Sequence, residues 1–75
     1  MMSLAQIKKG STVRIEHLAC EGKAKQRLID LGIYKGSNVK VKAFAPLGDP
    51  MIIEIKDCDF AIRKSDARKI FISSL

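Results

Sequence analysis

The clearest structural signal lies in residues 39–56, which read VKVKAFAPLGDPMIIEIK. Apolar residues occupy every odd position from 39 to 45, and the even positions hold two lysines and Phe44. This period of two is typical of a strand with one buried and one exposed face. Met51, Ile53 and Ile55 repeat the pattern, and the intervening Pro46-Leu47-Gly48-Asp49-Pro50 contains residues that favour turns. We therefore predict two strands joined by a turn.

Further strand signals flank this stretch. In Thr12–Leu18, Val13 and Ile15 alternate with charged residues, and we expect His17 to extend the inward set. The remaining expectations follow from turn residues and short apolar runs: a loose start at Met1–Ser3, a tight turn at Asp57–Asp59, a strand at Phe60–Arg63, a helical turn capped by Ser65 and running through Arg68, and a last strand at Lys69–Ser73.

A short helix is predicted between the first two of these strands. Ala24, Leu28 and Leu31 recur at helical spacing, so we expect them to form its buried face. Leu31-Gly32-Ile33 is typical of a helix that ends in a left-handed glycine, with Ile33 folding back onto Leu28. Gly32 should therefore have a positive φ.

Five short strands and one helix predict a mainly β protein. Antiparallel closure into a small barrel suits this pattern because a closed sheet has no exposed edges. The chain has 75 residues, which is enough for one core, so residues 1–75 are expected to form a single domain. A two-layer α+β sandwich is the structural alternative.

The net charge of +6 at pH 7 predicts an acidic partner. Nucleic acid is one candidate, because lysine and arginine release counterions from phosphate backbones. An acidic protein surface or an anionic membrane face would attract the same charge, so the charge alone does not choose among these partners.

The apolar runs indicate a protein that stays in the cytoplasm. Met51-Ile52-Ile53 is far shorter than the roughly 18 residues that span a bilayer, and the first residues lack a basic-then-apolar leader. In the cytoplasm Cys20 and Cys58 would be reduced thiols, and neither belongs to a Cys-x-x-Cys pair.

Catalytic and metal-binding motifs are weakly represented. The sequence has one histidine, no Gly-x-Ser-x-Gly motif and no glycine-rich phosphate loop, so we predict neither an enzyme nor a bound cofactor. His17 and Cys20 with Glu21 are legitimate ligand types for a transition metal, but a stable site needs three or four converging ligands. We expect no metal site and keep one at His17 and Cys20 as the alternative.

The predicted helix carries a candidate partner-binding surface. Lys23 and Arg27 are four residues apart, where like charges repel, and Ile29 projects away from the buried face among these charges. An apolar residue surrounded by charge suits a protein contact, and Tyr34 adds an amphipathic side chain nearby. We predict partner binding by Lys23, Arg27, Ile29 and Tyr34.

Two families are similar to parts of the chain. Lys9–Ile15 with Glu21-Gly22-Lys23 resembles the entry of ribosome-associated KOW barrels, but the helical Ala24–Leu31 departs from that pattern. The ferrous iron transport protein A (FeoA) family is matched over nearly the whole chain. The matching segments, in order, are Val13-Arg14-Ile15, Arg27–Ile33, Gly36–Val41, Pro46–Pro50, Ala61-Ile62-Arg63, Ala67 and Ile70.

The resemblance to FeoA implies an SH3-like barrel without catalytic residues, similar to a domain found in iron-dependent repressors. It implies docking on the cytosolic GTP-binding part of FeoB, a membrane ferrous-iron transporter, and modulation of iron transport. The chain would then meet the membrane only through the transporter, nucleic acid is not expected as a partner, and weak homo-oligomerisation stays open. An RNA- or ribosome-binding barrel is the alternative function.

Overall fold

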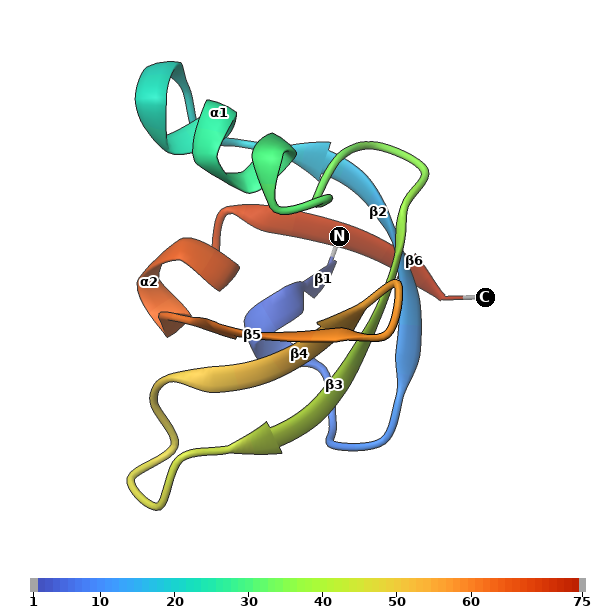
Figure 1. Cartoon of the computed structure of the whole chain (residues 1–75), viewed down its shortest axis with the longest axis vertical. Helices are drawn as coiled ribbons and strands as arrows, with labels where there is room; N and C mark the ends of the chain where they lie inside the picture. Colours follow the sequence, from blue (N-terminus) through green and yellow to red (C-terminus); the bar gives the residue numbers. More distant parts are fainter. Residues whose placement is uncertain (1, 75) are drawn as a thin grey trace.

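The structure is a computed structural model that describes residues 2–74 and, at Ser74, the backbone alone. Within these residues, six strands form one antiparallel sheet in the order β1-β6-β2-β3-β4-β5 (Figure 1). A short 3-10 helix, η1, follows β1, while α1 joins β2 to β3 and α2 joins β5 to β6. The elements are β1 (Met2–Ser3), η1 (Leu4–Gln6), β2 (Thr12–Leu18), α1 (Gly22–Asp30), β3 (Asn38–Phe44), β4 (Met51–Ile55), β5 (Cys58–Ile62), α2 (Lys64–Ala67) and β6 (Ile70–Ser74).

The strands β3, β4 and β5 form a meander that confirms the predicted strand pair. The Ala45 N–H donates to the Pro50 carbonyl at 2.9 Å and closes the predicted turn. Lys56 and Asp57 alone connect β4 to β5, with φ values of 50° and 66°. Positive φ at both central residues is the geometry of a type I′ turn, whose twist matches that of antiparallel strands.

Two β-bulges change the predicted alternation. Ile15 pairs with Ile72 and His17 with Phe71, so Glu16 is an extra residue in β2. Such an insertion reverses which side chains face inward. Leu18 is therefore buried and His17 is exposed, and the prediction that His17 points inward is wrong.

The second bulge lies in β3. Val41 pairs with Ile53 and Ala43 with Ile52, which leaves Lys42 without a partner residue in β4. The alternation shifts by one position after this insertion. Phe44 is half-buried and packs against the core, so the expectation that it shares the outward face with the lysines is wrong.

The curved sheet wraps around the core as in a barrel, but among the described residues β1 and β5, the two ends of the strand order, do not pair with each other. The expectation of a fully closed sheet without exposed edges is therefore wrong. Every strand contributes a buried residue, whereas α1 contributes only Leu28. A helix that buries one side chain is not a covering layer, so the α+β sandwich alternative is not adopted. Ala24 is exposed and Leu31 is 36% exposed, which corrects the prediction that both are buried. The core consists of Leu4, Ile7, Val13, Ile15, Leu18, Cys20, Leu28, Ile33, Val39, Val41, Met51, Ile53, Ile55, Ile62, Ala67, Ile70 and Ile72.

The start of the chain is more ordered than the sequence indicated. Met2 and Ser3 form β1 and pair with Ile72 and Phe71 of β6, so a loose start is wrong for these residues, while Met1 lies outside the described part. The Gln6 side chain accepts a hydrogen bond from the Ser3 N–H at 2.8 Å. Neither α1 nor α2, the α-helices within residues 2–74, has the length and apolar character needed to traverse a lipid bilayer.

Candidate functional site

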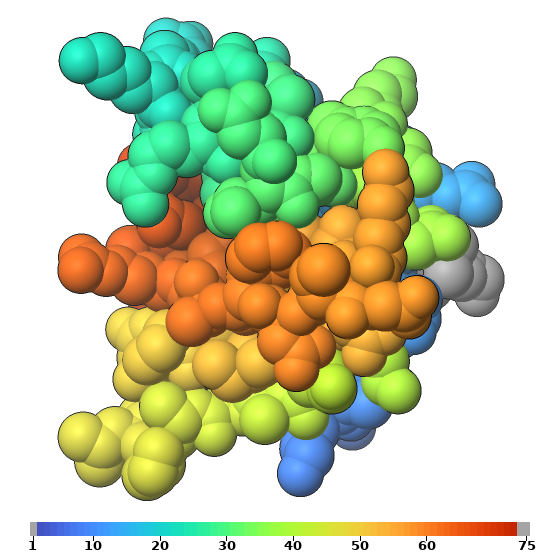
Figure 2. Space-filling model, viewed as in Figure 1, coloured from blue at the N-terminus to red at the C-terminus, as the bar shows by residue number. Residues whose placement is uncertain are grey.

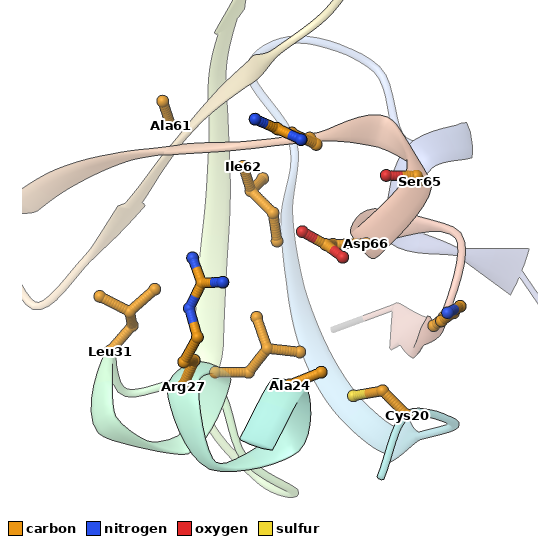
Figure 3. Close-up of a pocket in the computed structure, with 11 residues that line it drawn as sticks. Cys20, Ala24, Arg27, Leu31, Ala61, Ile62, Ser65 and Asp66 are labelled. Carbon is orange, nitrogen blue, oxygen red and sulfur yellow. The ribbon is translucent and has the colours of Figure 1, made fainter. Parts of the chain in front are cut away.

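A groove of about 370 Å³ separates α1 from β5 and α2. It is the candidate functional site because residues from four parts of the chain meet there. Figure 3 shows the Arg27 side chain extending from α1 into this space and Asp66 entering from α2. The lining residues are Cys20, Ala24, Arg27, Leu28, Leu31, Ala61, Ile62, Arg63, Ser65, Asp66 and Lys69.

The end of α1 sets one wall of the groove. The Ile33 N–H donates to the Leu28 carbonyl at 2.8 Å, and the Gly32 N–H donates to the Ile29 carbonyl at 2.9 Å. These two bonds define a Schellman motif, and Gly32 has a φ of 99°, as the sequence predicted. Because Ile33 is fully buried, it fixes the end of α1 and holds Arg27 and Leu31 at the groove.

The opposite wall depends on a capping bond from a distant turn. Asp49 Oδ1 accepts a hydrogen bond from the Lys64 N–H at 3.0 Å, at the first residue of α2. A carboxylate at this position satisfies a free N–H and complements the helix dipole. Ser65 makes no capping bond and α2 begins at Lys64, so the predicted cap at Ser65 is wrong. The capped turn presents Ser65 and Asp66 to the groove.

The charged groups of the groove are free of ion pairs. Arg27, Arg63 and Lys69 form none with Asp66 or with any other residue that the structure describes. Three cationic side chains and one carboxylate therefore surround a floor that includes Leu28 and Ile62. A binding surface of this kind favours an acidic ligand with apolar groups.

Charge pairing occurs instead on the outer face of the sheet. Lys42, the bulged residue of β3, lies 3.2 Å from an Asp59 carboxylate oxygen and 3.5 Å from one of Glu54. The hydrogen bond with Asp59, its negative charge and the weaker effect of Glu54 together raise the Lys42 pKa above its usual 10.5. This network connects three adjacent strands and does not reach the groove.

The four predicted partner-binding residues are all exposed, but they do not share one side of α1. Arg27 lines the groove, whereas Ile29 lies about 200° further round the helix by its 100° per residue. Between them runs an exposed ridge where the Gln26 amide donates to Asp30 at 2.8 Å. Tyr34 follows the helix, is 39% exposed, and has the Lys56 ammonium 5.9 Å from its ring centroid. Lys23 is exposed near the start of α1.

The two alternative metal ligands have different environments. His17 is exposed and stacks on Phe71 with ring centroids 6.2 Å apart, while Cys20 is buried and lines the groove. Within residues 2–74 no group of three or more His, Cys, Asp or Glu side chains is arranged to hold a metal ion. His17 and Cys20 are therefore not joined there by the further ligands that a stable site needs.

Several groove residues were not predicted. Ala61, Arg63, Asp66 and Lys69 come from a different part of the chain than α1, and they reach the groove only when β5 and α2 fold against it. Arg63 and Lys69 belong to a basic segment, residues 63–69, that could have indicated a second positive surface. No feature of the sequence indicates that this segment lies opposite Arg27.

Comparison with known proteins places the chain in a family. Residues 2–74 match the family described as the FeoA domain. The chain belongs to the FeoA family. A curated relative, the "Fe(2+) transport protein A/Fe(2+) transporter FeoB fusion protein" of Porphyromonas gingivalis, is 30% identical over 69 residues. The match covers 92% of this chain but only 8% of the fusion protein.

Solved structures of FeoA proteins share the fold. Iron(II) transport protein A from Clostridium thermocellum has a TM-score of 0.94 and 28% identity, and the match covers 99% of this chain and 46% of that chain. FeoA of Stenotrophomonas maltophilia, described as a prokaryotic SH3 domain protein and solved in complex with zinc, has a TM-score of 0.85 and 25% identity. That match covers 97% of this chain and 91% of the other. The predicted SH3-like barrel with one inserted helix is confirmed.

Proposed function

We propose that this FeoA-family chain is a small cytoplasmic accessory protein of ferrous-iron uptake. It docks on the cytosolic GTP-binding part of a FeoB-type transporter and modulates iron transport, without catalysing a reaction itself. The observation that carries the proposal is the Porphyromonas gingivalis relative, in which a FeoA part and a FeoB transporter form one chain. A covalent link gives two modules a high effective concentration, so the fusion supports the view that the two modules act in contact with each other.

The docking surface in this proposal is the exposed side of α1 together with Tyr34. Lys23 and Arg27 provide positive charge that would attract an acidic partner from a distance. Ile29 is 36% exposed and Tyr34 39%, so both have apolar surface left to bury. Because Arg27 and Ile29 lie on opposite sides of the Gln26–Asp30 ridge, a partner that contacts both must straddle the helix.

The aromatic residues support a protein partner over RNA. Stacking of bases requires accessible aromatic rings. Phe44 and Phe60 are half-buried against the core, and Phe71 is half-buried and stacked by His17. Among the phenylalanine and tyrosine residues within residues 2–74, Tyr34 is the one with substantial exposure, and the exposed His17 ring already stacks on Phe71. The basic surface is therefore better suited to carboxylates than to bases.

The test is binding of the full chain to the purified cytosolic domain of the organism's FeoB-type transporter, measured by biolayer interferometry at low and physiological salt. Reversing Lys23 and Arg27 to glutamate should slow association in a salt-dependent way. Ile29→Asp should weaken the complex by roughly 1–2 kcal/mol, which is about 5- to 30-fold. Reversal of Lys9 and Lys40, which are also exposed, is the matched control with the same change in charge.

Binding that is absent, or that all these variants leave unchanged, would contradict the proposal. An RNA gel shift at physiological salt runs beside it, because a tight RNA complex would favour the alternative function. Iron uptake into vesicles that contain the transporter, with and without the chain, then shows whether docking raises or lowers transport.

A further inference from the structure

Strand β5 has an unpaired edge. It is the last strand in the sheet order, and its ladder partner within residues 2–74 is β4 alone. Ile55 and Cys58 flank the two-residue turn, so they exchange backbone hydrogen bonds with each other. Hydrogen-bonded and non-bonded residue pairs alternate along an antiparallel ladder, which makes Asp59 and Ala61 members of non-bonded pairs. This alternation turns the N–H and C=O groups of Asp59 and Ala61 away from β4. Neither residue takes part in a backbone hydrogen bond outside the ladder among the described residues.

The unpaired edge borders the groove. Ala61 and Ile62 form part of its lining, with Arg27 and Leu31 of α1 on the opposite wall. In the space-filling view, the α1 residues lie next to the β5 segment on the same face of the molecule (Figure 2). The free backbone groups of Ala61 therefore adjoin a space of about 370 Å³ that α1 closes on its far side, and Asp59 lies two residues before Ala61 on the same strand edge. An extended peptide that enters this space would lie alongside β5, where an unpaired strand edge is a template for pairing.

The charges of the groove indicate what kind of peptide fits. Arg27, Arg63 and Lys69 have no ion-pair partner in the described part of the chain. Hydrogen bonds between such groups and carboxylates are about twice as strong as neutral ones. The groove also offers apolar surface, from Leu28, Leu31 and Ile62. This surface suits apolar side chains of the peptide, which would alternate with its acidic side chains along an extended strand.

We propose that the groove binds an extended, acidic segment of a protein partner, which pairs with the free edge of β5 as an additional strand. Backbone hydrogen bonds to Asp59 and Ala61 would provide affinity, and Arg27, Arg63 and Lys69 would select acidic side chains. We take the transporter of the proposed function as the source of that segment, and only this part of the inference rests on the proposed function. The groove chemistry itself depends on residues of this chain.

The test is an NMR titration of the isotope-labelled full chain with a capped octapeptide of alternating glutamate and valine. The amide signals of Asp59 and Ala61 should shift most, with further shifts along α1. An octapeptide with lysine in place of glutamate should bind about tenfold more weakly or worse. Two further versions of the acidic peptide have the same charge but carry N-methyl groups either on the valines or on the glutamates. Because alternate N–H groups of an extended peptide face β5, one of these two versions loses the N–H donors that pair with β5 and the other keeps them. A difference in binding between the two therefore reports strand pairing separately from charge.

Variants of the chain provide the second arm. Ala61→Pro removes the outward N–H and keeps pairing with β4, as is usual for proline on an edge strand. It should abolish the shifts. Reversal of Arg27 and Arg63 to glutamate should weaken binding about tenfold or more, whereas the same reversal at the exposed Arg14 and Lys40 should change it less than about threefold.

Three results would overturn the inference: no shifts at millimolar acidic peptide, shifts centred away from β5, or equal binding of both N-methylated peptides. The N-methylated peptides keep the question decidable even if Ala61→Pro does not fold. Failure of the peptide to bind would leave transporter docking on α1 intact. Peptide binding without transporter binding would instead reject the proposed function and leave the groove chemistry standing.

Discussion

Replacing Gly32 with alanine tests the link between the α1 cap and the barrel. Gly32 has a φ of 99°, and a Cβ there would lie 3.1 Å from Cγ2 of Ile55, a core residue that is 3% exposed. Gly36 is a matched control because its φ is 94° but a Cβ would meet nothing within 4 Å. The two substitutions therefore share a backbone penalty and differ in one contact.

The expected magnitudes follow from these two terms. Forcing an L-residue into the left-handed region costs about 1–2 kcal/mol, which is the whole effect expected for Gly36→Ala. Crowding a packed core adds about 1–3 kcal/mol, and because a single methyl group is involved, the lower half of that range applies to Gly32→Ala. Gly32→Ala should then lose roughly 2–4 kcal/mol, and for a domain of this size each kcal/mol lowers Tm by about 4–8 °C.

Urea unfolding followed by circular dichroism measures both variants. The transition midpoint should fall further for Gly32→Ala than for Gly36→Ala, while the m-value stays the same. Equal losses would show that Ile55 moves aside at no cost and would refute the packing term. No loss in either variant would refute the strain argument as a whole.

Three further predictions concern the turns and the charge network. Asp57→Gly should raise the unfolding free energy by roughly 0.5–1 kcal/mol, because glycine relieves the φ of 66° in the type I′ turn, whereas Asp59→Gly inside β5 should lower it; urea midpoints compare the two. Asp49→Ala should cost about 1 kcal/mol by removing the hydrogen bond to the Lys64 N–H, and Asp49→Asn, which keeps an acceptor oxygen, should recover most of it in thermal unfolding. The raised pKa of Lys42 means that its ion pairs stabilise the fold below about pH 10 and lose this effect as pH rises through the folded-state pKa. The Tm difference between wild type and Lys42→Met should therefore stay constant up to about pH 10 and shrink at higher pH. A difference that grows above about pH 10 would contradict the stabilising role of the Lys42 ion pairs.

Local signals in the sequence determined most of the strands and the helix cap. Thr12–Leu18 was predicted with its observed bounds, and the inward row Met51, Ile53 and Ile55 of β4 was predicted correctly, because alternation and flanking turn residues act within a few positions. Lys56, which the pattern had added to that strand, lies in the turn instead. The positive φ of Gly32 was predicted for the same reason: only the next residues along the chain decide whether a glycine cap forms. The surface exposure of Lys23, Arg27 and Ile29 also followed from helical periodicity.

The tertiary structure decided the features that depend on pairing between distant residues. The bulge at Glu16 exposes His17 because β6 sets the register of β2, and no local pattern encodes that register. Met2 and Ser3 become a strand only because β6 offers them an edge. Asp49 caps α2 from 15 residues away, so the sequence near Ser65 could not reveal the cap.

The candidate site shows most clearly the difference between what local sequence predicts and what the tertiary structure decides. Periodicity placed Arg27 on the surface of a helix, but the groove arises only where α1 faces the unpaired edge of β5. Leu31 is 36% exposed at that groove although helical spacing had placed it in the core, because α1 ends at Asp30 and only Leu28 of this helix packs into the core. The sequence pattern indicates which face of a single helix or strand is apolar and which is charged. The surface that two elements form together depends instead on how the whole chain packs.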